Sequence, residues 1–223
     1  FDPGSLDETM RYKRIVYSGN DDACISTSPE KLVTVLDSIT NNRIGIDPVR
    51  YCAGDHPGPI EGQTPGGGDA GNYAYQWEIQ TSGAWNHVDG ATYKDFTPQM
   101  LETDTRFRRI VYSGQLSVAD QYACNDTSPV LPLEVIPYII NLTGLQDQSL
   151  CQGNTPLPFD PLPATGGYGG ITYQWIAREE GSATWADAPG TSDQADYAPG
   201  SLEKTTWFAR KAFSDICEQV SDT

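Results

Sequence analysis

Histidine is scarce in this sequence: only His56 and His87 occur, and they lie in separate segments. The patterns C-x-x-C, G-x-S-x-G and H-E-x-x-H are all absent. These patterns carry the ligands of common zinc sites, the nucleophile of α/β-hydrolases and the catalytic helix of zinc proteases. The sequence therefore predicts no catalytic, cofactor-binding or metal-binding residue, and we expect that the protein is not an enzyme.

Long apolar runs and basic charge are also lacking. No stretch approaches the roughly 18 apolar residues that span a bilayer, and 14 Lys and Arg stand against 30 Asp and Glu, for a net charge of −16. Such a surface repels nucleic-acid phosphates and anionic lipids. We expect no membrane span and no nucleic-acid partner. Ca²⁺ is the cation that so acidic a chain would attract, and Asp95 and Asp196, which recur at one place, could bind it, cap a turn or accept from an arginine.

What the sequence does contain is an internal repeat. Residues 106–114, RFRRIVYSG, resemble RYKRIVYSG at 11–19 and, more weakly, WFARKAFSD at 207–215. Aromatic and β-branched residues in a run that ends at Ser and Gly or Asp predict a β-strand in each copy. Because strand side chains alternate between two faces, Phe107, Arg109 and Val111 should point to one side.

An arginine between apolar residues of a core-facing strand should be buried. A buried guanidinium needs hydrogen-bond acceptors and a flat surface over its plane. We expect Trp77 to supply the surface by a cation–π contact, and Asp95 or a loop carbonyl to accept the hydrogen bonds. The sequence thus predicts a structural clamp built from equivalent residues of the three copies: Arg14, Arg109, Arg210, Trp77 and Trp175.

The repeat divides the chain into three parts. Residues 1–37 are expected to be the C-terminal half of a first repeat, 38–137 a complete repeat, and 138–223 the N-terminal part of a third, all cut from a longer chain. Turn-rich composition, with 22 Gly and 16 Pro, and the absence of helical periodicity predict an all-β fold. The connections lack Gly/Ser tracts, so neighbouring repeats should form a semi-rigid rod.

The five cysteines recur in the repeats. Cys52 and Cys124 bracket the complete repeat, and Cys151 and Cys217 bracket the third. This bracketing predicts the bridges Cys52–Cys124 and Cys151–Cys217 and gives Cys24 a partner outside the chain. The first bridge would close a loop worth roughly 4 kcal/mol in the chain-entropy model. Ordered disulfides indicate export to an oxidising, extracellular compartment.

The motifs together resemble a known family. The pattern C-x-G … Y-Q-W … W … G … F/Y-x-P-x-x-L … Y/F-x-R-x-V … C-x-x-x-S-P is similar to immunoglobulin-like repeats of giant secreted and cell-surface proteins of Bacteroidota, which include gliding-motility adhesins exported by type IX secretion. The resemblance implies tandem immunoglobulin-like antiparallel β-sandwiches, truncated here at both ends, although Lys211 and Ala212 depart from the pattern. It also makes Ser38, in Asp-Ser-Ile, a candidate O-glycosylation site. Asn125 and Asn141 fit the N-x-S/T pattern for N-linked sugars.

The expected function is structural. The chain would be a segment of a long cell-surface adhesin or filament, a stalk that serves adhesion or gliding motility. Its partners would be neighbouring repeats, surface polysaccharide or other cell-surface proteins. A carbohydrate-binding array that uses Trp85, Trp185 or Trp207 as a sugar platform remains an alternative, as does an accessory region of a secreted hydrolase. Exposed tryptophans in a shared concavity would favour binding, and buried ones would favour the stalk.

Overall fold

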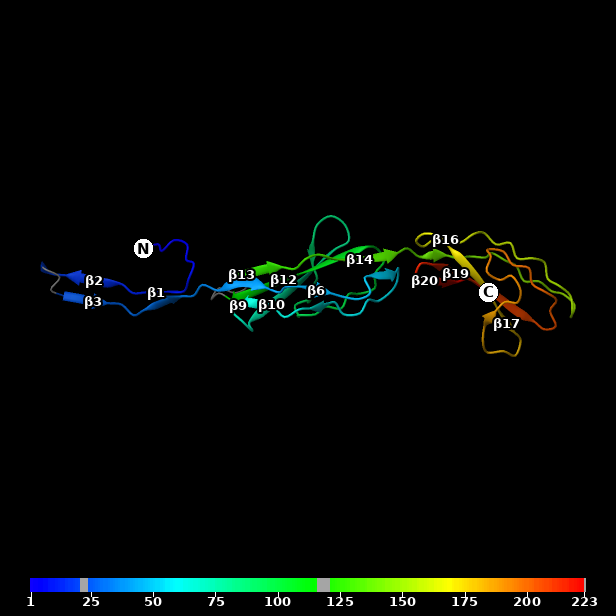
Figure 1. Ribbon diagram of the computed structural model, residues 1–223, viewed down its shortest axis with the longest axis horizontal. Helices are drawn as coiled ribbons and strands as arrows, with labels where there is room; N and C mark the ends of the chain where they lie inside the picture. The colour runs from blue at the N-terminus through cyan, green and yellow to red at the C-terminus, as the bar shows by residue number, and fades with distance from the viewer. Residues whose placement is uncertain (21–23, 116–120, 223) are drawn as a thin grey trace.

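The computed structural model of this chain describes residues 1–20, 24–115 and 121–222. Figure 1 shows an elongated rod in which the three repeats follow one another along the long axis. Every regular element in the described residues is a β-strand, and no described helix is long and apolar enough to cross a membrane. The fold is therefore all-β, as the composition predicts.

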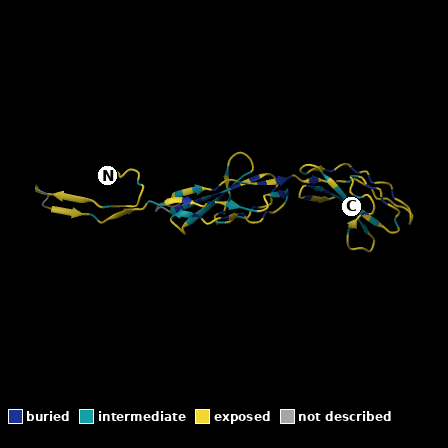
Figure 2. Ribbon diagram, in the orientation of Figure 1, coloured by how far each residue is buried: buried dark blue, intermediate teal, exposed yellow. Residues whose placement is uncertain are grey.

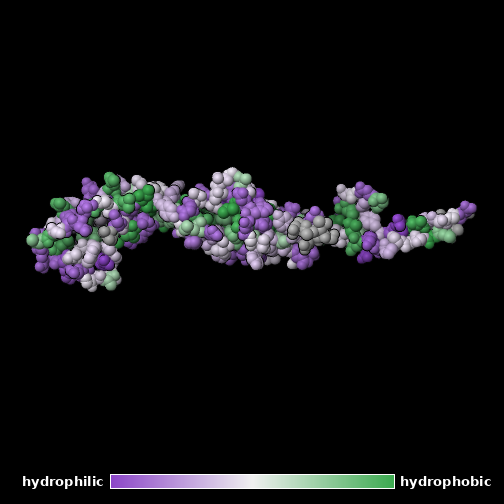
Figure 3. Space-filling view, turned by 180° about the vertical axis from the view of Figure 1, so that it is seen from behind, coloured by the Kyte–Doolittle hydropathy of each residue, from purple (hydrophilic) through white to green (hydrophobic). Residues whose placement is uncertain are grey.

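The first repeat consists of two separate strand pairs. In one pair β1 (Met10–Tyr12) lies antiparallel to β4 (Lys31–Val33), and in the other β2 (Ile15–Ser18) lies antiparallel to β3 (Cys24–Thr27). Nearly every described residue of these strands is exposed (Figure 2). In the space-filling view, hydrophobic residues reach the surface at this narrow end of the rod (Figure 3), and the exposed apolar side chains of its strands are Met10, Ile15, Val16, Tyr17, Ile25, Leu32 and Val33.

The second repeat is centred on one large sheet. Its strands lie in the order β11 (Asn86–His87), β10 (Tyr73–Gln80), β12 (Thr105–Gln115), β14 (Leu131–Ile136) and β7 (Arg50–Cys52), with β13 (Tyr122–Thr127) also on β12. Two short pairs complete the repeat: β5 (Asp37–Thr40) with β9 (Gly66–Gly68), and β6 (Ile44–Gly45) with β8 (Glu61–Gly62). The long strand β12 thus pairs with β14 through its first part and with β13 through its second.

The third repeat copies the centre of the second. Its sheet has the order β18 (Ala186–Asp187), β17 (Thr172–Glu179), β19 (Thr206–Ser214) and β20 (Cys217–Val220), and β15 (Ile139–Ile140) pairs with β16 (Thr165–Gly166). The registers agree: Trp77 lies opposite Arg109 as Trp175 lies opposite Arg210. Counterparts of β14 and β7 are absent from the described residues of this repeat.

Among the strands that the structure describes, all pairs but one are antiparallel. Strand β14 runs parallel to β7, and Ile136 lies opposite Cys52 at the end of the pair. An entirely antiparallel second repeat, as the sequence predicts, is therefore wrong in this detail. Both strands run toward the third repeat, and their last residues lie at the junction between the two repeats.

The core of the second repeat lies between its large sheet and the short pairs. Trp77 and Phe107 have no exposed surface, as the alternation along their strands predicts, and Ile60 and Leu133 pack in the same cluster. In the third repeat the equivalent cluster contains Phe159, Trp175, Ala188 and Tyr197. Each of these two repeats thus builds its own aromatic core.

Replacing Phe107 with alanine should lower the free energy of unfolding of the second repeat by about 3–5 kcal/mol, because a fully buried ring is lost and a cavity remains. Tyr93→Ala is the matched control, since the Tyr93 side chain is 77% exposed. Urea denaturation followed by tryptophan fluorescence would measure both variants. Equal losses in the two would contradict the assignment of Phe107 to the core.

Candidate functional site

The second and third repeats each contain one buried arginine that binds several segments of its own repeat. Arg109 and Arg210 lie at equivalent places on β12 and β19 and have no exposed surface. Nε of Arg109 donates to Asn42 Oδ1 at 3.1 Å, and its terminal nitrogens donate to the same oxygen at 2.9 Å, to the Lys94 carbonyl at 2.8 Å and to the Gln63 carbonyl at 2.9 Å. All three guanidinium nitrogens are therefore hydrogen-bonded.

Arg210 repeats this arrangement with different partners. Its Nε donates to Asn141 Oδ1 at 2.9 Å, and its terminal nitrogens donate to the carbonyls of Ala195 and Leu162, each at 2.9 Å. Burial lowers the pKa of both arginines from the usual range, but an arginine stays protonated in a protein. The second and third repeats thus each contain a buried cation whose acceptors are neutral amide and carbonyl oxygens.

Aromatic rings cover each guanidinium. The carbon at the centre of the Arg109 guanidinium is 5.0 Å from the centre of the Tyr75 ring and 6.0 Å from that of Trp77. For Arg210 the corresponding distances are 4.8 Å to Tyr173 and 5.9 Å to Trp175. Tyrosine is therefore the nearer ring in both repeats, and tryptophan, which the sequence predicts as the cover, is the more distant one.

The acceptor of Arg109 differs from the prediction in part. Loop carbonyls do accept, but the Asp95 carboxylate accepts from the Gly62 amide at 2.8 Å and forms an ion pair with Lys94 instead. These contacts, led by the Gly62 amide, lower the pKa of Asp95. Asp95 therefore links its loop to the backbone of β8, and the carbonyl of the neighbouring Lys94 accepts from the Arg109 guanidinium.

The asparagines that bind the arginines were missed by sequence reasoning. Asn42 and Asn141 are buried, and each also donates through its side-chain amide to the carbonyl of its arginine. Asn141 therefore cannot be a sugar acceptor, although it fits the N-x-S/T pattern. The available signal was the recurrence of Asn at the end of the matching junction segments 37–42 and 137–141.

Arg14 does not form a clamp. It lies in the same backbone setting as the other two, since its amide donates to the Ser28 hydroxyl at 2.8 Å and its carbonyl accepts from the Ser28 amide at 2.8 Å. Its side chain is nevertheless exposed. The described part of the first repeat has no counterpart of β10 or Asn42 to cover it, so inclusion of Arg14 in the clamp is wrong in this structure.

The disulfide joins two repeats and does not lie within one. Cys52 of the second repeat is bonded to Cys217 of the third, with their Cα atoms 5.8 Å apart, and Cys24, Cys124 and Cys151 are free. The predicted bridges Cys52–Cys124 and Cys151–Cys217 are therefore wrong. Cys52 ends β7 at one end of the repeat, whereas Cys124 lies opposite Ser113 in the β12–β13 hairpin at the other end.

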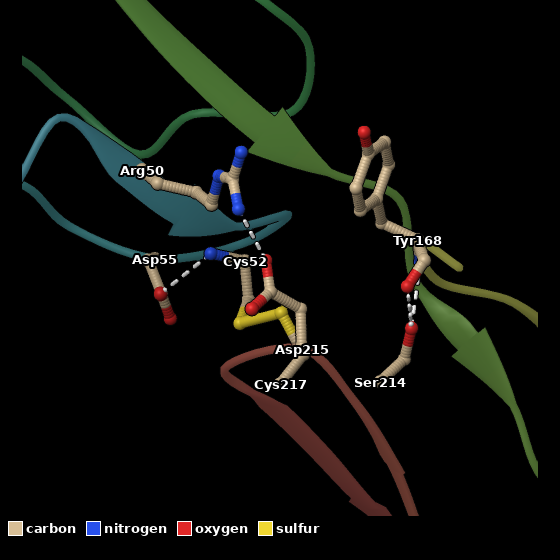
Figure 4. Close-up of a disulfide and its surroundings, with 7 residues drawn as sticks. All are labelled: Arg50, Cys52, Asp55, Tyr168, Ser214, Asp215 and Cys217. Atoms are coloured by element: carbon tan, nitrogen blue, oxygen red, sulfur yellow. Dashed lines mark hydrogen bonds and ion pairs between the residues drawn. A yellow bond between two sulfur atoms is a disulfide. The ribbon is translucent and has the colours of Figure 1, made fainter. Parts of the chain in front are cut away.

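Charged and aromatic side chains surround this disulfide. Figure 4 shows Arg50 beside the two cysteines, directed toward Asp215 across the junction. Arg50 binds the Asp215 carboxylate at 2.6 Å and the Glu134 carboxylate at 2.8 Å, and both contacts raise its pKa. Its guanidinium also lies over the ring of Tyr168, 5.4 Å from the centre. Residues of both repeats therefore enclose the bond.

An apolar cluster fills the junction. Ile136 of the second repeat packs with Ile139, Ala164, Ala212 and Cys217 of the third, and Cys52 packs against this cluster. Tyr138, in the connector, donates from its hydroxyl to Glu102 at 3.2 Å. The junction thus combines a covalent bond, an ion pair and apolar contact over a connector of two residues between β14 and β15.

The remaining predicted sites are dispersed. The described residues contain no group of three His, Cys, Asp or Glu side chains that could hold a metal ion. Ser38 lies exposed on β5, so its glycosylation stays a prediction. The ring of Trp85 is covered by Arg108 at 4.3 Å, and Arg178 lies over both Trp185 and Trp207, at 5.2 and 4.9 Å. These tryptophans therefore do not offer bare ring faces on these sides.

Comparison with known families identifies the repeat. A model of the family described as Domain of unknown function (DUF8696) matches the chain twice, at residues 45–129 and 141–223. The matches cover more than half of the chain, so the protein belongs to this family. Each match lies within one of the repeats described above. No curated protein matches the chain.

Replacing Arg109 with methionine should lower the free energy of unfolding by about 3 kcal/mol, because buried acceptors lose their charged donor. Arg106→Met on the same strand is the control, since Arg106 is exposed, and it should change stability by less than about 0.5 kcal/mol. Urea denaturation would measure the difference. Similar losses in both variants would show that the Arg109 contacts add nothing.

Proteolytic digestion of the oxidised protein without reduction should release one peptide pair, joined through Cys52 and Cys217. Thiol alkylation before digestion should label Cys24, Cys124 and Cys151. The bond closes a loop across 165 residues, which stabilises the folded chain by about 5 kcal/mol in the chain-entropy model. Recovery of Cys52 joined to Cys124 by mass spectrometry would contradict this pairing.

Proposed function

We propose that this member of the DUF8696 family is a structural segment of a long extracellular surface adhesin or filament. Its repeats, which we take to be immunoglobulin-like sandwiches, form a semi-rigid stalk that holds a distal binding region away from the cell. Neighbouring repeats are its first partners, and surface polysaccharide or other cell-surface proteins are bound elsewhere. Such a stalk would serve in cell adhesion or in gliding motility.

The observation that carries this proposal is the Cys52–Cys217 bond between repeats. A disulfide within each repeat would stabilise domains that remain free to reorient. A disulfide across the junction, next to a two-residue connector, gives consecutive repeats two covalent links. Two links and the apolar cluster around Ile136 restrict both bending and twisting. Restriction of that kind serves a protein whose task is to keep its ends apart.

The disulfide also supports an extracellular location. Structural disulfides persist in oxidising compartments and are rare in the cytosol. The excess of acidic residues keeps such a chain soluble and repels anionic cell surfaces. A stalk that projects from the surface is consistent with both properties.

Binding of carbohydrate is the weaker alternative. A sugar platform needs an accessible aromatic face, and arginines lie against the rings of the three tryptophans that are not in a core. An accessory role beside a secreted catalytic domain does not require these tryptophans to be accessible, so their contacts do not bear on it. A glycan array probed with the 223-residue protein would separate binding from the stalk, which predicts no specific signal.

The stalk predicts that the second and third repeats tumble as one body. Residual dipolar couplings of backbone amides in the two repeats should fit a single alignment tensor in the oxidised protein. In Cys217→Ser, where the junction loses its covalent bond, the two repeats should need separate tensors. Cys124→Ser is the matched control, because it removes a free thiol from the equivalent hairpin, and it should leave the single tensor unchanged.

Separate tensors in the oxidised wild-type protein would count against a stalk. A single tensor that persists in Cys217→Ser would leave the rod intact but assign its stiffness to the apolar cluster and Arg50. Unfolding of a variant would not be mistaken for independent motion of the repeats, since the amide spectrum of each repeat shows whether that repeat is folded.

A further inference from the structure

Three hairpins of this chain present a cysteine in one register. Cys217 lies opposite Ser214, Cys124 opposite Ser113 and Cys24 opposite Ser18. In the two repeats with a central sheet this serine is buried, and its hydroxyl accepts from a backbone amide of the glycine-rich turn, at 2.6 Å from Tyr168 and 2.7 Å from Asp69. The hairpin that carries the bonded Cys217 thus recurs, and we call these three elements the donor hairpins.

Two turns present the other cysteine in one geometry. In the turn 52–55, the Gly54 amide donates to the Leu101 carbonyl at 2.7 Å and the Asp55 amide to the Cys52 carbonyl at 2.9 Å. In the turn 151–154, the Gly153 amide donates to Leu202 at 2.8 Å and the Asn154 amide to Cys151 at 3.0 Å. We call these the acceptor turns. The first is bonded to a donor hairpin, and the second carries the exposed, free Cys151.

At the junction between the first and second repeats, the β12–β13 hairpin lies close to a residue that is equivalent to Ile136. A Cβ atom on Gly114, near the end of β12, would lie 2.4 Å from a side-chain carbon of Leu36 of the first repeat. Leu36 precedes β5 as Ile136 precedes β15, and Ile136 is the residue that packs beside Cys217. The hairpin of Cys124 therefore faces the preceding repeat in the way that the hairpin of Cys217 does.

We infer that the disulfide between repeats is periodic. Cys151 is the acceptor half of another junction, and its partner is the hairpin cysteine of a further repeat of this family, presented head to tail. Cys124 and Cys24 are hairpin cysteines like Cys217. The partner of each is the acceptor-turn cysteine of the repeat that precedes its own, as Cys52 is for Cys217. The inference deepens the proposed function. The pairing itself follows from the geometry of the junction, and only the use of the disulfides to stiffen a stalk rests on the proposed function.

Bond formation needs an oxidant, and a disulfide such as oxidised glutathione supplies it. The thiolate of one cysteine attacks a sulfur of the oxidant, forms a mixed disulfide and releases one reduced thiol. The thiolate of the partner cysteine then displaces the second thiol. Two protein thiols are oxidised to one disulfide, and one oxidant disulfide is reduced to two thiols, which carry the two protons.

The chain itself supplies the parts for a test. A second copy of residues 131–223 joined after Thr223 would add a strand equivalent to β14, a connector and a donor hairpin. Serine in place of Cys151 in the added copy leaves two acceptor-turn cysteines, Cys52 and the original Cys151, for the two copies of Cys217. After folding in a glutathione redox buffer, we expect two disulfides, Cys52 with one hairpin cysteine and Cys151 with the other, and free Cys24 and Cys124.

The control is the same extended chain with Cys151→Ser at the original position as well. It should form only the Cys52 bond and keep one additional free thiol, as counted by intact mass after alkylation. Free Cys151 in the first chain, or Cys151 joined to a cysteine of its own repeat, would overturn the inference. A doubled mass on non-reducing gels would also overturn it, because it would show pairing between chains.

This outcome is separable from that of the stalk. If Cys151 pairs as expected but the repeats align independently in the dipolar-coupling measurement, the periodic disulfide stands and the rigid stalk fails. If the repeats align as one body while Cys151 remains free, the stalk stands and the periodicity fails.

Discussion

The hydrogen bonds of a buried guanidinium set the geometry on which the rest of this rod depends. Arg109 cannot be buried without acceptors, and one of them, Asn42, lies five residues after the start of the connector strand β5. Asn42 also donates to the carbonyls of Arg109 and Asp126. One polar cluster thus fixes the segment that enters the repeat to both β12 and β13. Because Asn141 does the same for Arg210, the second and third repeats are each entered at a defined place, and the junction before each of them is defined as well.

The contacts at the junction then fix the second and third repeats relative to each other along the rod. Arg50 and its carboxylate partners are partly exposed, and exposed ion pairs contribute only about 0–1 kcal/mol each. The apolar cluster of Ile136, Ile139 and Ala212 is small. Neither would hold two repeats against repeated bending. The covalent bond between Cys52 and Cys217 is the contact that does not dissociate, and the other contacts determine the angle at which it holds.

Sequence reasoning reached the strands and the buried arginine but not its partners. The alternation of Phe107, Arg109 and Val111 is a local property, so burial of all three follows from the period of a strand. The acceptor Asn42 is 67 residues distant from Arg109, and no local pattern indicates which amide returns to a given strand. Arg14 shows the converse: the same local sequence stays exposed where the opposing strand is missing from the described residues.

The disulfide was mispredicted for a related reason. Two cysteines that bracket a repeat in sequence suggest a pair, but bracketing says nothing about the ends of the fold at which they lie. Strand β7 ends at one end of the repeat, whereas the β12–β13 hairpin turns at the other, so Cys52 and Cys124 are separated by the length of the domain. Only the direction of the strands, which is a tertiary property, brings Cys52 to the next repeat.

A bond between repeats also changes how a pulled chain would extend. Tension applied at the two ends passes through Cys52–Cys217, so the segment between these two cysteines, which lie 165 positions apart, is bypassed. Fully extended, that segment would span about 540 Å at roughly 3.3 Å per residue, and the disulfide withholds this length even if the repeats inside it unfold. A bridge within each repeat would leave the connector as the sole covalent link and protect no junction. The observed pairing limits extension at the place where a chain of separate domains would otherwise be weakest.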